Sequence, residues 1–178
     1  GLGDVYKRQF LFCCYAGMRY SDFINLSSEN IVDINQETWL IYKSVKTGTE
    51  VRLPLYLLFS GKGITILNKY KDNLEDFFHL RDNSNINKDL IIITRLAGLS
   101  KRISFHTARH TNATLLIYNG INITTVQKLL GHKSVKTTQI YTNVMDMTII
   151  HDLEKMKQAI PIAAVSYTHL RAHETVLD

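Results

Sequence analysis

Residues 102–143, RISFHTARHTNATLLIYNGINITTVQKLLGHKSVKTTQIYTN, constrain the fold of this chain more strongly than any other stretch. Apolar residues recur at helical spacing over residues 106–118 and again over residues 123–130, and a glycine follows each pattern. Gly120 and Gly131 stand where helices commonly end in a left-handed residue, so we expect two helices joined by a short turn. The polar residues that follow each helix must then lie in turns.

Chemically versatile side chains lie at the ends of these predicted helices. His106 and Arg109 are three residues apart, so one face at the start of the first helix carries both, and the helix N-terminus adds positive potential there. His132 directly follows the second helix, and Tyr141 comes nine residues later, after a short helix that Ser134 can cap. Two basic groups, a ring donor and a phenol suit a site that holds a phosphate and attacks it.

Two other interpretations of these side chains remain open. The segment HTARH places His106 and His110 at i and i+4, as in the HExxH zinc motif, but Thr107 stands where the glutamate is needed and Arg109 would repel a metal. The second alternative is purely structural, with buried histidines hydrogen-bonded into the core and Tyr141 serving as a packing residue. From spacing alone, the structural role is the more common one for single histidines and tyrosines.

The residues before this stretch predict a buried helix and a second, short helix. Residues 10–17 (FLFCCYAG) are too apolar to be exposed, and the glycine at the end is a natural helix stop. Ser21 can cap the short helix, with Asp22 in its first turn. Arg19 would then lie between two helices and point into a cleft, or pair with Asp22 or Glu29 on the surface.

Residues 30–54 predict a small antiparallel sheet. Trp39 and Ile41 alternate with their neighbours, a second alternating run ends at Pro54, and KTGT between them supplies a hairpin turn. Lys46 is thus expected at a loop tip, where most lysines are simply solvated.

The remaining segments predict further helices and one loop. Residues 63–70 and 89–99 show helical spacing, the second closing at Gly98, whereas residues 72–88 are polar and irregular, so we expect a loop there. A last helix is expected over residues 145–158. Its apolar stripe consists of Met145, Ile149, Leu153 and Met156.

Composition sets broad limits on the function. The 178 residues fit one domain, at most two small ones, and the net charge of +5 with a pI of about 9.2 favours an anionic partner. The adjacent Cys13 and Cys14 form neither a disulfide framework nor a zinc spacing, so we expect a reduced, cytosolic protein. No apolar run is long enough for a membrane span, and no signal peptide opens the chain.

Both ends of the chain look foreign. GDVYKRQ at residues 3–9 and VSYTHLRAHETVLD at residues 165–178 resemble translated sequencing-adapter sequence, and removing both leaves the net charge at +5. We therefore expect adapter-like segments at residues 1–9 and 165–178 around one folded domain at residues 10–164. The natural protein is expected to begin upstream of Phe10.

The ordered motifs together resemble the catalytic domain of the tyrosine recombinases, the phage-integrase family. His-x-x-Arg, then Leu-Leu-Gly-His, then a tyrosine nine residues on, is similar to the family's signature, and AGMRYSDFINL resembles its first arginine box. The family's hairpin lysine is matched by Lys46. The residues within the motifs are most similar to those of integrases of mobile elements in Bacteroides-like bacteria. The catalytic positions that the resemblance implies are Arg19, Lys46, His106, Arg109, His132 and Tyr141.

The resemblance also implies a fold and a reaction. The fold is α+β and mainly helical, with a small three-stranded antiparallel sheet near its N-terminal part; the family's N-terminal core-binding domain is expected to be missing. The implied reaction breaks and rejoins DNA through a 3′-phosphotyrosine link without metal, ATP or another cofactor. In it Tyr141 is the nucleophile, Arg19, Arg109 and His132 hold the phosphate oxygens, His106 is the acid/base partner, and Lys46 protonates the leaving 5′-oxygen.

The implied partner is double-stranded DNA, and the implied assembly is a homotetramer on two DNA sites. The implied location is the bacterial cytoplasm, with no membrane partner. The final helix would dock on a neighbouring protomer or pack on its own domain, and His110 is expected to be a structural neighbour. Candidate DNA-backbone contacts, for which a merely solvated role is equally open, are Lys101, Arg102, Lys133 and Lys136. A catalytically inactive DNA-binding relative and a type IB topoisomerase remain the alternatives.

Overall fold

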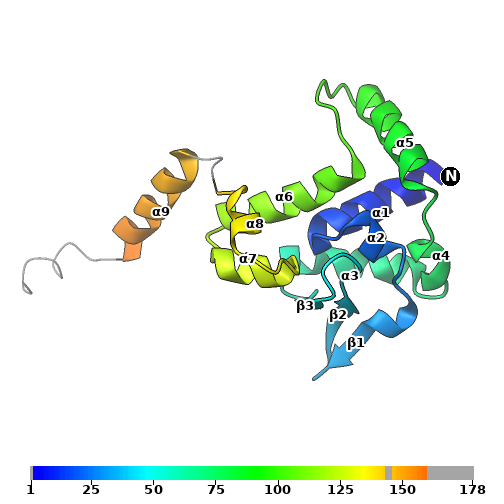
Figure 1. Cartoon of the computed structure of the whole chain (residues 1–178), viewed down its shortest axis with the longest axis horizontal. Coiled ribbons are helices and arrows are strands. Elements are labelled where there is room, and N and C mark those ends of the chain that lie inside the picture. The colour runs from blue at the N-terminus through cyan, green and yellow to red at the C-terminus, as the bar shows by residue number, and fades with distance from the viewer. Residues whose placement is uncertain (1, 143–145, 160–178) are drawn as a thin grey trace, which may run out of the picture. The chain divides into compact units, whose positions relative to one another are not determined.

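The computed structural model describes residues 2–142 and 146–159, which fall into two compact units, residues 1–142 and residues 143–178. The first unit combines helices with one three-stranded sheet (Figure 1). Its elements are α1 (Leu2–Ala16), α2 (Tyr20–Phe23), β1 (Ile31–Ile34), β2 (Glu37–Lys43), β3 (Glu50–Pro54), α3 (Lys62–Leu67), α4 (Leu74–Phe78), α5 (Asn83–Leu96), α6 (Phe105–Tyr118), α7 (Ile123–Leu129) and α8 (Lys136–Gln139), with short 3-10 turns at Ser28–Asn30, Leu58–Gly61 and Asn68–Tyr70.

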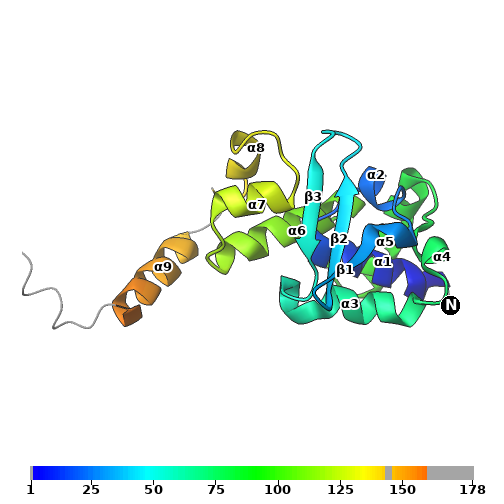
Figure 2. The same cartoon turned by 90° about the horizontal axis from the view of Figure 1, so that it is seen from below.

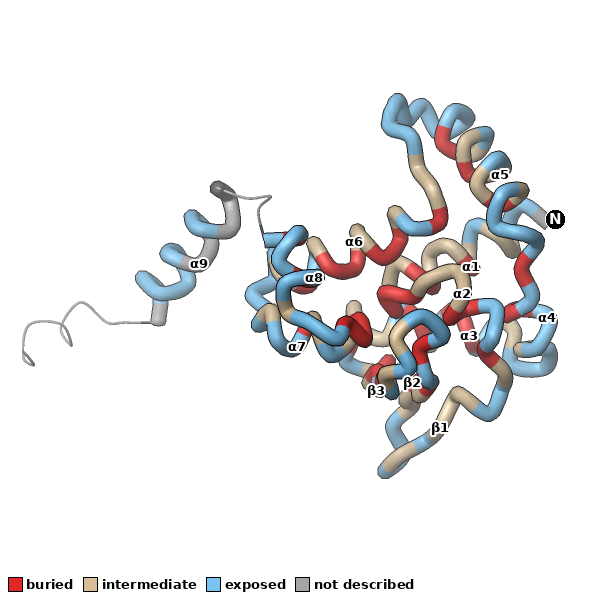
Figure 3. The backbone as a smooth tube through the Cα atoms, viewed as in Figure 1, coloured by how far each residue is buried: buried red, intermediate tan, exposed pale blue. Residues whose placement is uncertain are grey.

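Helices α1 and α6 lie side by side and form the centre of the core (Figure 3). Phe12 of α1 is fully buried and its ring contacts those of Phe23, Phe77 and Phe78 at centroid distances of 5.9 to 6.4 Å. The helix predicted at residues 10–17 is therefore confirmed. It begins earlier than expected and includes the adapter-like residues 3–9.

The sheet has the order β1-β2-β3, and both strand pairs are antiparallel (Figure 2). Leu40 pairs with Leu53 and Tyr42 pairs with Val51, and all four side chains are buried on one face. This alternation confirms the predicted sheet. Strands β2 and β3 form a hairpin, and residues 44–49 are the loop that joins them.

The prediction of a loop at residues 72–88 was wrong for most of that segment. It contains α4 and the first turns of α5, and α5 begins six residues before the helix expected at residues 89–99. The physical reason is Asp82, whose carboxylate accepts hydrogen bonds from the backbone amides of Ser84 and Asn85 and so caps the helix. Ile86 then turns inward and is buried among the core residues.

The helix boundaries around the central stretch follow its caps. Asn122 caps α7 as predicted, and its side chain accepts a hydrogen bond from the amide of Thr124. Gly131 has φ +63° and ends α7 in a Schellman motif, in which its own amide and that of His132 donate to carbonyls of the last turn. The apolar stripe and the two glycine stops thus act as predicted.

Two predicted caps differ from the structure. The residue before α2 is Arg19, not Ser21, which lies inside the helix. Val135 stands at the start of α8, although the Ser134 hydroxyl still accepts a 3.3 Å hydrogen bond from the backbone amide of Lys136. Both helices are single turns, so packing rather than the capping residue sets where they begin.

In the second unit, the described element is α9 (Asp146–Ala159). Ile149, Leu153 and Met156 of the predicted apolar stripe are each more than half exposed, and Met145 lies outside the described residues. Among the helices that the structure describes, none is long and apolar enough to cross a membrane.

Gly131→Ala is expected to destabilise the protein more than Gly98→Ala. Both glycines have a left-handed φ, which costs a non-glycine residue about 1–2 kcal/mol. A Cβ at Gly98 meets no atom within 4 Å, whereas one at Gly131 would lie 2.6 Å from Cγ2 of the buried Val51, adding an overpacking cost of about 1–3 kcal/mol. Urea unfolding of both variants measures the difference; equal losses would contradict the account.

Candidate active site

All six predicted catalytic residues lie in the first unit, where five separate elements carry them. Arg19 precedes α2, Lys46 lies in the loop between β2 and β3, His106 and Arg109 are on α6, His132 follows α7 and Tyr141 follows α8. Each of them interacts electrostatically with at least one of the others, so the fold gathers them at one site.

Arg109 is the most enclosed member of the site, with only 1% of its surface exposed. Its Nη1 donates to the carbonyl of Gly17 at 2.8 Å and its Nη2 to the carbonyl of Leu130 at 2.6 Å. Burial, followed by the charge of Arg19, lowers the pKa of Arg109 to about 10. The guanidinium therefore stays charged at neutral pH while its direction is fixed by two backbone groups.

Arg19 is held by a buried carboxylate. Its Nη1 lies 3.4 Å from Oδ2 of Asp22 and donates to the Ser44 hydroxyl at 3.1 Å. Asp22 also accepts hydrogen bonds from the Ser44 hydroxyl and the Val45 amide, so it ties α2 to the end of β2. Arg19 lines a pocket, as one interpretation expected. It also pairs with Asp22, but Asp22 is buried, so the expected pairing on the surface was wrong.

That pocket has a volume of about 310 Å³ and brings together three of the predicted residues from distant parts of the chain. Lys46 and His106 are exposed at its rim, and Arg19 is half-buried. Its lining residues are Arg19, Tyr20, Ser21, Lys46, Asn83, Asn87, Ser104, Phe105 and His106. Three groups that can carry or take up a proton thus line one pocket, which suits an anionic group such as a phosphate.

His132 is buried and held by a neighbour that the sequence did not single out. Its Nδ1 lies 2.9 Å from the hydroxyl of Thr138, which is fully buried. Burial, then the charges of Arg109 and Arg19, lower the pKa of His132 to about 4. The ring is therefore neutral at pH 7, and if Thr138 donates to Nδ1, the proton of the ring lies on Nε2.

Tyr141 is buried against two imidazole rings. The ring of His132 lies parallel to it at a centroid distance of 6.5 Å, and the ring of His110 meets it edge-on at 5.3 Å. Burial raises the pKa of the Tyr141 phenol, and the charges of Arg109 and Arg19 oppose that shift. The phenol is thus protonated at neutral pH and needs a base before it can attack.

His106 has the properties of such a base. Partial burial, then the charges of His110 and Arg109, lower its pKa below 6.5, so it is neutral and can accept a proton at pH 7. His110 lies between His106 and Tyr141, because its ring contacts those of both His106, at a centroid distance of 4.5 Å, and Tyr141. The sequence predicted His110 only as a structural neighbour, and its packing matches that role.

The candidate DNA contacts are all exposed, three of them in loops and Lys136 at the start of α8. Lys101 and Arg102 precede α6 and line a second pocket of about 330 Å³ together with Arg95, and Lys133 and Lys136 lie between His132 and Tyr141. Within the part of the chain that the structure describes, no three His, Cys, Asp or Glu side chains gather as a metal site requires.

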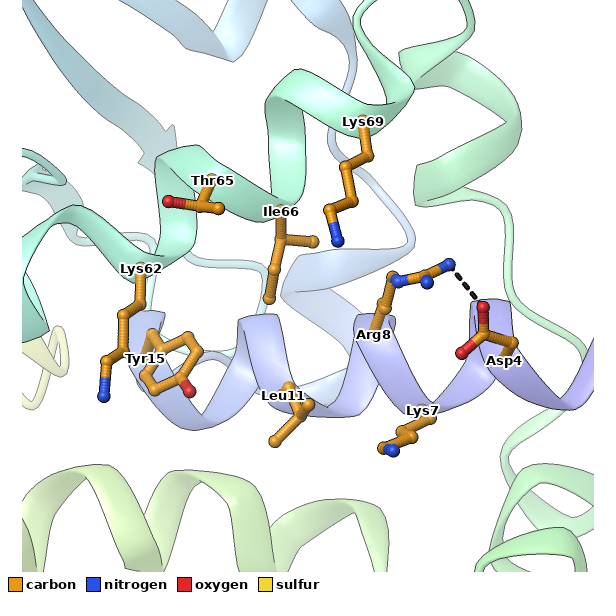
Figure 4. A pocket seen from close by; sticks show the side chains of 9 residues that line it. All are labelled: Asp4, Lys7, Arg8, Leu11, Tyr15, Lys62, Thr65, Ile66 and Lys69. Atoms are coloured by element: carbon orange, nitrogen blue, oxygen red, sulfur yellow. Dashed lines mark ion pairs between the residues drawn. The ribbon is translucent and has the colours of Figure 1, made fainter.

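Figure 4 shows another polar pocket, of about 320 Å³, between α1 and α3. Asp4 and Arg8 form an ion pair at 2.6 Å on one side of it, and Lys62 and Lys69 lie across from α1. The pocket contains none of the predicted site residues, and its charged groups on α1 come from the adapter-like segment. It is therefore not the candidate active site.

The low pKa of His132 predicts how stability depends on pH. In the unfolded chain this histidine is protonated below about pH 6.5, whereas in the folded protein it stays neutral down to about pH 4. His132 therefore lowers the free energy of unfolding as the pH drops through that range. Between pH 7.5 and pH 5 the unfolding free energy of the parent should fall by about 1–2 kcal/mol more than that of His132→Gln. Denaturant unfolding at both pH values tests this, and identical pH dependence would show that His132 titrates normally.

Comparison with known proteins gives the family of the chain. A sequence profile of the phage integrase family matches residues 4–147. A tyrosine recombinase of Thermosipho africanus is 32% identical over 149 residues, covering 80% of this chain and 50% of that protein. Tyrosine recombinase XerA of Saccharolobus solfataricus is 32% identical over 137 residues, covering 72% of this chain and 42% of the relative. The chain thus spans about half the length of these relatives, and a Bacteroides-type origin stays a prediction.

Solved structures agree on the fold. The crystal structure of XerA recombinase matches with a TM-score of 0.64 and 26% identity over 89% of this chain and 64% of that one. A lambda integrase dimer bound to a COC′ core site matches with a TM-score of 0.63 and 24% identity, over 77% of this chain and 41% of that one. The predicted α+β, mainly helical fold with its small antiparallel sheet is confirmed, and the chain belongs to the phage integrase family.

Proposed function

We propose that this chain is the catalytic part of a site-specific DNA recombinase or integrase that breaks and rejoins DNA through a 3′-phosphotyrosine link. The observation that carries the proposal is the convergence of a buried tyrosine, two arginines, two neutral histidines and an exposed lysine around one site. The chemistry of these groups is that of phosphoryl transfer. The tyrosine recombinases that the chain resembles support the same assignment.

The two arginines hold the scissile phosphate. A guanidinium binds two oxygens of a phosphate at once, and its charge opposes the negative charge that builds in the pentacovalent transition state. Arg109 contributes a direction fixed by two carbonyls, and Arg19 contributes one fixed by Asp22. Neither arginine has to be ordered when DNA binds, so their binding energy is available to the transition state.

Tyr141 attacks the phosphorus and His106 takes its proton. The new bond joins the phenolic oxygen to phosphorus, and the bond to the 5′-oxygen breaks. Because the phosphodiester energy is kept in the covalent link, the reverse attack by a 5′-hydroxyl rejoins DNA without ATP. His106 is suited to the proton transfer because its imidazole is neutral at pH 7.

His132 and Lys46 complete the reaction at the other oxygens. His132 donates from Nε2 to a non-bridging oxygen, with Thr138 holding the opposite ring nitrogen. Lys46 gives a proton to the leaving 5′-oxygen from the rim of the pocket. Lys101, Arg102, Lys133 and Lys136 contact the phosphate backbone on either side of the site.

The assembly we propose is four protomers on two duplexes, in the cytoplasm of a bacterium, with residues 10–164 as the catalytic domain. A lambda integrase dimer on a core site supports the DNA partner and pairwise binding. The exposed apolar residues of α9 offer a surface for docking on a neighbouring protomer.

Two other functions share parts of this site. A type IB topoisomerase would use the same chemistry, but no feature of the described residues favours it. An inactive DNA-binding relative would retain the basic residues without the reactive ones, whereas this chain has every catalytic position filled. The alternatives differ from a recombinase in whether a covalent adduct forms and whether a second strand is joined.

Covalent trapping tests the proposal. The protein is incubated with a pool of nicked DNA duplexes of randomised sequence and examined for SDS-resistant protein–DNA adducts. We expect an adduct with the parent and none with Tyr141→Phe, because the phenylalanine keeps the ring but lacks the attacking oxygen. Sequencing the trapped DNA then gives the preferred site.

His110→Phe serves as the matched control in this experiment. This variant changes the His110 ring, which packs edge-on against Tyr141, and leaves the proposed reacting groups in place. An adduct formed equally by the parent and by Tyr141→Phe would remove the tyrosine from the reaction. No adduct from a full-length protein on DNA that it demonstrably binds would favour the inactive relative.

A further inference from the structure

We propose that Thr47 is a positioning residue that holds Lys46 against the rest of the active site. This inference rests on the proposed role of Lys46 as the proton donor to the leaving oxygen. Thr47 follows Lys46 in the loop between β2 and β3, and its hydroxyl donates to the carbonyl of Gly131 at 3.0 Å. That bond joins two parts of the chain that are 84 residues apart and meet beside the site.

The acceptor belongs to a rigid part of the structure. The carbonyl of Gly131 and the amide of His132 form one peptide unit, and that amide donates to the carbonyl of Gln127 at 3.0 Å in the Schellman motif. The side chain of Gln127 returns a 3.1 Å hydrogen bond to the carbonyl of His132. The turn is therefore fixed without Thr47, and Thr47 attaches the loop to it.

The loop itself presents an exposed lysine and needs such an attachment. On the side of β2 it is fixed by the Val45 amide, which donates to Asp22 at 2.8 Å. On the side of β3, the Thr47 hydroxyl also accepts a 3.4 Å hydrogen bond from the Thr49 amide. Lys46 therefore lies between two attachments of the loop. Val45 binds Asp22, the partner of Arg19, and Thr47 binds the carbonyl of Gly131 in the turn before His132.

The chemical consequence concerns the leaving group. When the bond between tyrosine and phosphorus forms, the bond to the 5′-oxygen breaks, and that oxygen needs a proton, which the Lys46 ammonium supplies. A 5′-bridging sulfur needs no such proton, because a thiol is far more acidic than an alcohol and leaves as the thiolate. Loss of Thr47 should therefore slow the cleavage of an oxygen-bridged duplex and spare a sulfur-bridged one.

The test compares Thr47→Val with Thr47→Ser on a nicked duplex of the sequence recovered by trapping, with either oxygen or sulfur at the 5′-bridging position. Thr47→Val should cleave the oxygen substrate about tenfold more slowly, a fraction of the about 10²–10⁴-fold that a general acid supplies. It should cleave the sulfur substrate at the parental rate. Thr47→Ser should behave as the parent on both.

Other patterns overturn the inference. If Thr47→Val slows both substrates equally, the hydroxyl serves the stability of the whole site, and if it slows neither, Lys46 needs no anchor. If the parent cleaves neither substrate, the proposed function fails, and hydrogen exchange of the loop decides the anchor without DNA. The amides of Val45 and Gly48, which donate to Asp22 and to the carbonyl of Ser44, should then exchange several-fold faster in Thr47→Val than in Thr47→Ser, and equal exchange would refute the anchor.

Discussion

The buried guanidinium of Arg109 is the interaction on which the rest of the structure depends. Its two hydrogen bonds end on carbonyls at the C-terminal ends of α1 and α7, where helices leave backbone acceptors unpaired and where the helix dipole favours a positive charge. Gly17 and Gly131 supply the left-handed turns that bring these ends close. One side chain thereby joins three helices and interacts with Tyr141, the proposed nucleophile.

Other polar side chains of the site are also held by buried partners. Asp22 is buried, but its carboxylate has partners in Arg19, Ser44 and the Val45 amide at the start of the loop between β2 and β3, so it holds these three together. Thr138 does for His132 what Asp22 does for Arg19. Arg19 and His132 are thus each fixed by a residue behind them, and the energy needed to order these two side chains is spent during folding rather than during binding.

Much of this could be predicted from the sequence because it is encoded locally. Helix ends at Gly17 and Gly131 and the hairpin turn at Lys46 follow from backbone preferences, and the reactive residues follow from their ordered motifs. The start of α5 was missed because Asp82 caps it inside a polar run that otherwise looks like a loop. The roles of supporting residues such as Thr138 depend on hydrogen bonds between side chains and segments that only the folded chain brings together.

The most direct test of this account is the unfolding free energy of Arg109→Met, measured with denaturant beside Arg109→Lys. The methionine keeps most of the side-chain volume but leaves the carbonyls of Gly17 and Leu130 unpaired, so we predict a loss of about 2–6 kcal/mol, at about 1–3 kcal/mol for each buried acceptor. Arg109→Lys keeps the charge but cannot bind both carbonyls in the fixed fork geometry, so it should lie in between. A methionine variant as stable as the parent would contradict the claim that Arg109, the proposed phosphate ligand, also holds the fold together.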